Sequence, residues 1–226
     1  MKAKDYYKFI DHTNLSREAD WQQLVQLGQE AIEFGAASVC VQPSYVKELK
    51  EHFGDKLRIC TVIGFPFGYN TTASKVFEAK DAIANGADEI DMVINNLQVK
   101  DRRFDLIKTE IEAIRQACPP PVILKVIVET ALLSKEDLSR LSVIVSESGA
   151  DYIKTSTGYS TSGAKLEDIA LMRASKSPKL KIKAAGGIRS YEQVKAFVAA
   201  GCDRIGASSA LKAIKLAEAS ERGLTS

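Results

Sequence analysis

The sequence predicts an α/β fold, a single-domain (β/α)8 TIM barrel that spans residues 1–226. Short β-branched runs alternate with amphipathic segments eight times, and this alternation implies parallel strands. One barrel commonly reaches this length, and no linker or low-complexity segment divides the chain. An open doubly wound sheet is the structural alternative. It would more often carry a GxGxxG turn after its first strand, and this sequence has none.

The expected strands are short apolar runs bounded by turn residues, at 9–12, 38–41, 58–63, 89–94, 122–129, 152–155, 181–185 and 204–206. Helices are expected between them because capping residues, glycines and prolines mark their ends. The helices expected in this way run from Ser16 to Gly35, Pro43 to Gly54, 73 to Gly86, 104 to Pro119, Ser134 to Gly149, 166 to 174 and Ser190 to Gly201, and a last helix begins at Ser209.

Composition excludes several classes of function. The formal charge is +2, from 31 basic and 29 acidic residues, which gives no footprint for nucleic acid or a membrane surface. No apolar run has the length of a membrane span, and the N-terminus lacks a signal-peptide core. The four cysteines form no CxxC pair, so we expect reduced thiols in a cytoplasmic protein. With two histidines, a multi-histidine metal site is not expected.

Several strands carry charges on the face opposite their apolar one, and this polar face must look into the barrel. The residues placed there are Asp11, Glu89, Asp91, Lys125, Glu129, Lys154, Lys181 and Lys183. Buried charges must be paired or functional. Lys181 with Glu89 is the expected structural pair, and the set as a whole predicts a site at the carboxyl end of the barrel. Cys40 shares this face and either packs or reacts. The role of His12 stays open, and His52 has no expected function.

Residues 151–160, DYIKTSTGYS, begin as a strand and end as a loop rich in hydroxyls. Lys154 points inward there, and a buried lysine suits an amine nucleophile that attacks a carbonyl. The alternative is a strand-end lysine that reaches water through its aliphatic stem. Gly186-Gly187 and Ser208-Ser209 follow the last two expected strands, where barrels commonly bind phosphate. A Gly-Gly pair by itself is usually only a turn.

The chain resembles the deoxyribose-phosphate aldolase family. The matching segments extend from the first expected strand to the last: FIDHTNL (9–15), EIDMVIN (89–95), LKVIVET (124–130), YIKTSTGYS (152–160), IKAAGGIR (182–189) and IGASSA (205–210). The resemblance implies a class I aldolase that cleaves 2-deoxy-D-ribose 5-phosphate to acetaldehyde and D-glyceraldehyde 3-phosphate. It implies no cofactor and no metal, and a place in cytoplasmic deoxyribonucleoside catabolism.

The resemblance also implies roles for residues at matching positions. Lys154 is the Schiff-base lysine, Lys183 lies beside it, and Asp91 belongs to the proton relay. Asp11, Lys125 and Cys40 match inner-face positions. The phosphate-binding positions are Gly158, Gly186, Gly187, Ser208 and Ser209. Family members often form homodimers. Some end in a tail with a C-terminal tyrosine; residues 223–226 read GLTS, so that contribution is expected to be missing or supplied otherwise.

Other functions compete with this interpretation. Another Schiff-base aldolase or a transaldolase-like barrel would use the same lysine chemistry. A phosphosugar isomerase would need a base but no lysine adduct, and a phosphate-binding barrel without aldolase activity would need neither. Trapping with acetaldehyde and borohydride separates these classes, because only a protein that forms an imine gains the reduced two-carbon adduct.

Overall fold

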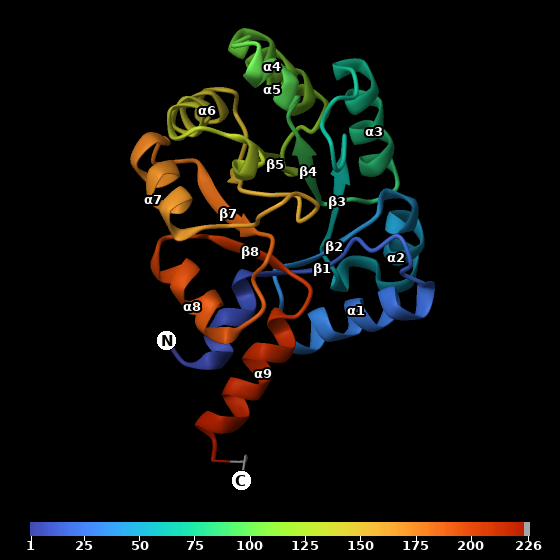
Figure 1. Cartoon of the computed structure of the whole chain (residues 1–226). Coiled ribbons are helices and arrows are strands. Elements are labelled where there is room, and N and C mark those ends of the chain that lie inside the picture. Colours follow the sequence, from blue (N-terminus) through green and yellow to red (C-terminus); the bar gives the residue numbers. More distant parts are fainter. Residues whose placement is uncertain (224–226) are drawn as a thin grey trace.

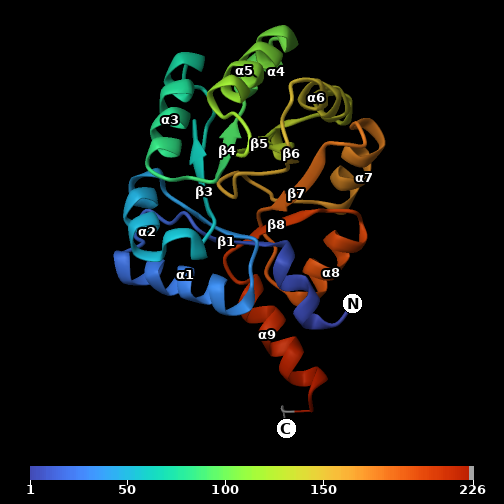
Figure 2. The same cartoon turned by 180° about the vertical axis from the view of Figure 1, so that it is seen from behind.

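Eight parallel strands close into a barrel, and helices surround it, in the computed structural model of the chain (Figure 1 and Figure 2). The strands follow one another in chain order, and β8 pairs with β1 to complete the ring. The predicted barrel is confirmed, and the open sheet is excluded. The structure describes residues 1–223; the end of the tail segment considered above, residues 224–226, lies outside them.

The elements agree closely with the expected ones. The strands are β1 (Ile10–Asn14), β2 (Ser38–Val41), β3 (Ile59–Ile63), β4 (Glu89–Val93), β5 (Ile123–Ile127), β6 (Tyr152–Lys154), β7 (Lys181–Ala185) and β8 (Arg204–Ala207). The α-helices are α1 (Trp21–Phe34), α2 (Val46–Phe53), α3 (Thr72–Ala84), α4 (Asn96–Lys100), α5 (Phe104–Ala117), α6 (Lys135–Glu147), α7 (Leu166–Ser175), α8 (Tyr191–Ala199) and α9 (Ala210–Glu221). The 3-10 helices are η1 (Ala3–Phe9), η2 (Pro43–Tyr45), η3 (Gly54–Lys56) and η4 (Thr130–Leu132).

Several predicted helix ends are confirmed, among them Ser190, which caps α8 by accepting from Gln193 N, and one predicted cap is wrong. Ser134 accepts a hydrogen bond from Asp137 N and caps α6, and Gly35 ends α1 at a positive φ of 68°. Ser16 does not cap α1. Asp20 does, by accepting from the backbone nitrogen of Gln23 at 2.8 Å. The 3-10 helix η2 is the first turn of the helix expected from Pro43. The other 3-10 helices and α4 were not expected, because such short segments show no helical periodicity.

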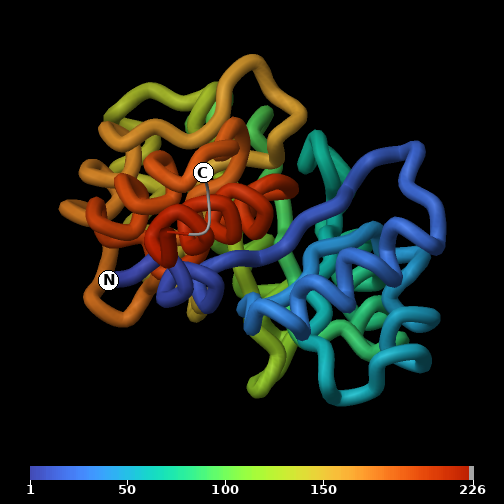
Figure 3. The backbone as a smooth tube through the Cα atoms, turned by 90° about the horizontal axis from the view of Figure 1, so that it is seen from below, coloured from blue at the N-terminus to red at the C-terminus, as the bar shows by residue number. Residues whose placement is uncertain are grey.

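The main apolar core lies between the barrel wall and the helices. On β4, for example, Ile90 and Met92 face outward and are fully buried. Opposite the carboxyl ends of the strands, η1 and α9 lie side by side (Figure 3), and Ala3 N donates to the carboxylate of Glu221. None of the helices within residues 1–223 combines the length and the apolar character needed to cross a bilayer.

A buried ion pair fixes the carboxyl end of β4, the strand that carries Asp91. Lys75 on α3 donates to Glu110 on α5 at 2.8 Å and to the carbonyl oxygen of Val93 at 2.8 Å. The second oxygen of Glu110 accepts from the backbone nitrogen of Asn95. Because both side chains are buried, each needs the other to offset its lost hydration. The pair therefore ties two helices to the end of this strand.

Candidate active site

Asp91 lies at the centre of the charged barrel interior. One of its oxygens, Oδ2, accepts hydrogen bonds from Lys154 Nζ at 2.7 Å and from Lys183 Nζ at 2.8 Å. The other, Oδ1, accepts from Lys125 Nζ at 2.7 Å. All four side chains are buried. One carboxylate therefore holds three lysine nitrogens inside the barrel.

Strand register brings these residues together. Asp91 pairs with Lys125 across β4 and β5, and Lys154 pairs with Lys183 across β6 and β7. Lys125 itself pairs with Tyr152, two residues before Lys154. Lys154 and Lys183 therefore belong to the next layer of inward side chains, nearer the carboxyl ends of the strands, where barrel enzymes have their active sites.

A second set of ion pairs lies around the first. Asp11 contacts Lys183 Nζ at 2.5 Å and Arg204 at 2.5 Å, and Glu89 contacts Lys125 Nζ at 2.6 Å and Arg204 at 3.3 Å. The buried ion network thus consists of the carboxylates Asp11, Glu89 and Asp91 and the cations Lys125, Lys183 and Arg204, with Lys154 as its seventh member. Three carboxylates balance three cations. A neutral Lys154 would leave these seven groups without net charge.

The predicted pair of Lys181 with Glu89 is wrong. Lys181 is the first residue of β7, at the amino end of the barrel, and its side chain is exposed. Its ammonium lies 5.5 Å from the centre of the Tyr152 ring. Arg204, which the sequence analysis did not select, is the cation that pairs with Glu89. The sequence could have identified Arg204 by its position on β8, two residues before Gly206, because strand alternation places both residues on the inner face.

Gly206 makes room for one of the lysines. A Cβ atom at this position would lie 3.0 Å from Lys183 Cε, closer than ordinary van der Waals contact. The side chain of Lys183 therefore passes beside bare backbone on its way to Asp11 and Asp91. A larger residue on the inner face of β8 would displace it.

The ion pairs shift the titration of the network. Burial alone would raise the pKa of Asp91, but the charges of Lys125, Lys154 and Lys183 hold it well below its usual value. Burial would lower the pKa of Lys183, but Asp11 and Asp91 raise it well above that of an ordinary lysine. These shifts hold Lys183 as a cation and Asp91 as an anion near neutral pH.

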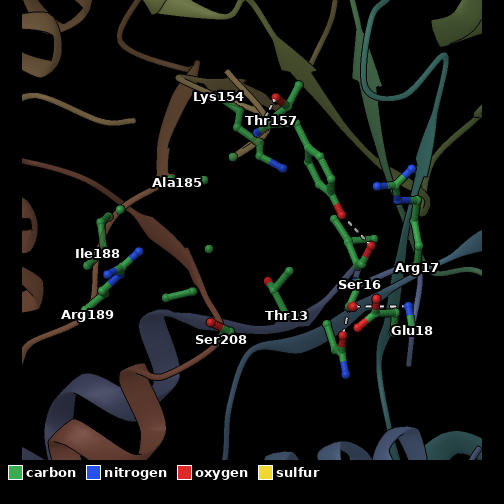
Figure 4. Close-up of a pocket in the computed structure, with 18 residues that line it drawn as sticks. Thr13, Ser16, Arg17, Glu18, Lys154, Thr157, Ala185, Ile188, Arg189 and Ser208 are labelled. Carbon is green, nitrogen blue, oxygen red and sulfur yellow. Dashed lines mark hydrogen bonds between the residues drawn. The ribbon is translucent and has the colours of Figure 1, made fainter. Parts of the chain in front are cut away.

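A cavity of about 570 Å³ opens above this network at the carboxyl ends of the strands. Its lining includes Lys154, Thr157, Gly158, Gly186, Gly187 and Ser208. Figure 4 shows Lys154 and Thr157 on one side, Ser208 and Arg189 on another, and Ser16 to Glu18 opposite. Gly186 and Gly187 have φ values of 87° and 76°, which glycine adopts without strain. Of the predicted phosphate residues, Ser209 is not part of this lining; it is the N-cap of α9.

Glu129 orders the loop that follows Lys154. Its Oε2 atom accepts from the backbone nitrogen of Thr157 at 3.2 Å and from Thr157 Oγ1 at 2.5 Å. Strand alternation predicted that Glu129 faces into the barrel but indicated no role for it. Its φ of 56° and these bonds turn it toward the loop that bears Gly158. Tyr159 then donates to the carbonyl oxygen of Leu15 at 2.6 Å, which links this loop to the one after β1.

The structure also shows the contacts of His12, whose role the sequence left open, and of Cys60, for which the sequence indicated no role. His12 Nε2 lies 2.8 Å from Glu30, and burial lowers the pKa of this imidazole. Cys60, which the sequence analysis treated only as a reduced thiol, contacts both Asp91 and Lys125 at 3.2 Å. No sequence signal identified it, because a cysteine on an apolar strand looks like a packing residue.

The assignment of Arg204 to the network can be tested against Lys181. Replacing Arg204 with Met leaves Asp11 and Glu89 short of a buried cation, so we expect unfolding to become easier by about 3–5 kcal/mol. Lys181→Met removes a solvent-exposed charge and should change stability far less. Urea denaturation of both variants measures the difference. Equal effects would show that Arg204 does not support the buried carboxylates.

Comparison with known proteins agrees with this geometry. The family model for the DeoC/LacD family aldolase matches residues 6–217. A deoxyribose-phosphate aldolase of Streptococcus pyogenes serotype M28 is 52% identical over 95% of this chain and 96% of its own length. The solved structure of QR15, an aldolase, has a TM-score of 0.90 at 38% identity and covers 97% of this chain and 98% of its own. A tetrameric deoxyribose phosphate aldolase from Aeropyrum pernix has a TM-score of 0.88 at 30% identity, over 99% and 94%. The chain belongs to the DeoC/LacD family of aldolases.

Proposed function

We propose that this chain reversibly cleaves 2-deoxy-D-ribose 5-phosphate to acetaldehyde and D-glyceraldehyde 3-phosphate through a Schiff base on Lys154. Family membership and the 52%-identical relative support the reaction. The observation that carries the mechanism is Lys154 itself, which borders the cavity with Nζ 2.7 Å from Asp91. Residues 1–226 act as one aldolase domain in cytoplasmic deoxyribonucleoside catabolism and self-associate, with a homodimer as the expected form.

The first step is imine formation. Neutral Lys154 attacks the aldehyde carbon of the open-chain sugar, and loss of water gives an iminium that acts as an electron sink. The charge of Lys183 favours this step, because its ammonium shares Asp91 Oδ2 with Lys154 and disfavours a second positive charge there. Lys125 occupies the other oxygen of Asp91 and holds the carboxylate in place.

The second step breaks the carbon–carbon bond. A base removes the proton of the 3-hydroxyl, the C2–C3 bond electrons move into the iminium, and D-glyceraldehyde 3-phosphate leaves. Asp91 is the base, acting through a water that it shares with Lys183. The enamine left on Lys154 is then protonated at carbon and hydrolysed, which releases acetaldehyde and restores the amine.

The loops after β7 and β8 hold the substrate phosphate. Gly186 and Gly187 can bring backbone N–H groups close to an anion, and Ser208 lies just before the N-terminus of α9. Gly158 lines the same cavity from the loop after β6. Ser209 contributes from the cap position rather than from the lining. With this arrangement we expect the phosphate on one side of the cavity and the aldehyde carbon at Lys154.

Trapping tests the nucleophile directly. The protein should gain a reduced two-carbon adduct after incubation with acetaldehyde and borohydride, and peptide mapping should place it on Lys154. Lys154→Ala should fold, since it leaves the balanced charges in place, but lose both the adduct and aldolase activity. An adduct that persists in this variant and maps to Lys183 would reverse the assignment.

The electrostatic role of Lys183 predicts a shift in pH dependence. Its raised pKa keeps it cationic throughout the assay range, so Lys183→Leu removes a positive charge beside Lys154. Protonated Lys154 then becomes more favourable, and the pH profile of imine formation should move to higher pH. Part of the lost rate should return in alkaline buffer, whereas Lys154→Ala should recover at no pH. Superimposable profiles for Lys183→Leu and the parent would limit Lys183 to proton transfer or positioning.

The phosphate site can be tested with a charge at its edge. Ser208→Asp places a carboxylate where the substrate anion should lie, so KM for deoxyribose 5-phosphate should rise about 10²-fold, by analogy with other repulsive charge contacts. Cleavage of unphosphorylated deoxyribose should change much less. Ser208→Asn serves as the neutral control of similar size. Equal losses on both substrates would place the phosphate elsewhere.

A further inference from the structure

Two cysteines face each other inside the barrel and have no part in the proposed mechanism. Cys40 on β2 and Cys60 on β3 are partners in the strand register. Both are fully buried, and their sulfur atoms lie within 4.8 Å of each other. Cys118 and Cys202 differ from them, because both pack in the apolar layer outside the barrel. The inner pair is therefore a dithiol placed among the charges of the active site.

The pair adjoins the reacting groups. Cys60 Sγ lies 3.2 Å from Asp91 Oδ1 and accepts from Lys125 Nζ at 3.2 Å. Leu15 packs against Cys40 and Cys60 and also lines the cavity. A small neutral molecule that reaches Lys154 is thus one side chain away from the two sulfurs. Any movement of Cys60 Sγ also changes the surroundings of Asp91.

The two thiols differ in their chemistry. A hydrogen bond from Cys60 and the charges of Lys183 and Lys154 lower the pKa of Cys40, although burial opposes them. Burial raises the pKa of Cys60 well above that of an ordinary thiol. By contrast, burial raises the pKa of Cys118 to about 11 and that of Cys202 to about 12. Cys40 is thus the better nucleophile, and Cys60 is a neighbouring thiol that can react with it next.

We propose that Cys40 and Cys60 form a reversible oxidation site, in which a peroxide converts the dithiol to a disulfide and switches the active site off. The loss of activity rests on the proposed function, whereas the formation of the disulfide does not. Hydrogen peroxide, which is small and uncharged, fits the buried position of the pair.

The reaction balances in two steps. The Cys40 thiolate attacks one oxygen of hydrogen peroxide, which forms a sulfenic acid and releases hydroxide; this hydroxide becomes water with the proton that the Cys40 thiol had given up. The Cys60 sulfur then attacks the sulfenic sulfur, the S–S bond forms, and a second water leaves with the Cys60 proton. The two sulfurs together lose two electrons, and the peroxide is reduced to two waters.

Strand geometry explains why this bond would be both possible and reducible. Neighbouring strands lie about 4.7–4.9 Å apart, which falls within the Cα separation that disulfides accept. Cβ atoms of in-register partners lie at a similar spacing, slightly beyond the usual range of about 3.5–4.5 Å, so the bond is strained. To form it, Cys60 Sγ must leave Asp91 and Lys125. A displacement of about 1 Å in a reacting group can lower a rate about 10²-fold.

The experiment treats the purified protein with hydrogen peroxide and follows thiols and activity together. We expect the free thiols of the denatured protein to fall from four to two, and a non-reducing peptide map to show the Cys40–Cys60 bond. Aldehyde trapping on Lys154 should slow at least tenfold, and dithiothreitol should restore it. Cys60→Ala should keep a much larger fraction of its own untreated activity, whereas the matched control Cys118→Ala/Cys202→Ala should lose activity like the parent.

Several results would overturn the proposal. Four free thiols after activity is lost would place the damage elsewhere, and loss that dithiothreitol cannot reverse would indicate overoxidation. Inactivation that a chelator prevents would indicate a thiophilic metal bound by the sulfurs and Asp91. A mapped disulfide with unchanged trapping would show that the pair does not control the site. If the unoxidised protein lacks aldolase activity, the proposed function fails, while the peptide map still decides whether the bond forms.

Discussion

The barrel interior depends on one requirement, that every charge buried around Asp91 has a partner. Its two oxygens hold Lys125, Lys154 and Lys183, which come from three successive strands. Arg204 then joins the remaining carboxylates from β8. The network therefore links strands on opposite sides of the barrel. A shift of one residue in the register of any of them would turn its charge into the apolar layer.

Such a network is a poor way to gain stability. Removing two charges from water costs several kcal/mol for each ion, and well-packed apolar residues often serve a core as well or better. The proposed mechanism gives these ions another role, in the chemistry at Lys154. With the other six groups balanced, an added proton on Lys154 gives the interior a net positive charge. Lys154 is thus not needed to neutralise a buried carboxylate, and the proposed mechanism uses it as the amine that attacks a carbonyl.

The sequence predicted the barrel and the central residues because strand alternation is a strict rule. Period-2 spacing put Asp91, Lys125, Lys154 and Lys183 on inner faces, and they meet there. It failed for Lys181 because a residue at the end of a strand can turn its side chain to solvent. Alternation fixes a face, but not which ions pair across the barrel, so Arg204 was missed. Glu129 contacts Thr157 in the loop after β6, and Cys60 contacts Asp91 and Lys125 on other strands; the pattern of a single strand contains neither contact. The roles inferred for the site residues stay predictions.

The same charge balance bears on the carbon–carbon cleavage. Iminium formation puts a positive charge on the nitrogen of Lys154 that no carboxylate in the balanced set offsets in full. In the proposed mechanism the proton of the 3-hydroxyl passes to Asp91, so that the iminium becomes a neutral enamine and the carboxylate becomes a neutral acid. Two opposite charges disappear in one step. Because separated charges are less well solvated in a buried site than in bulk water, this neutralisation is more favourable there. In the proposed mechanism, the network around Asp91 therefore also favours the step in which the substrate breaks.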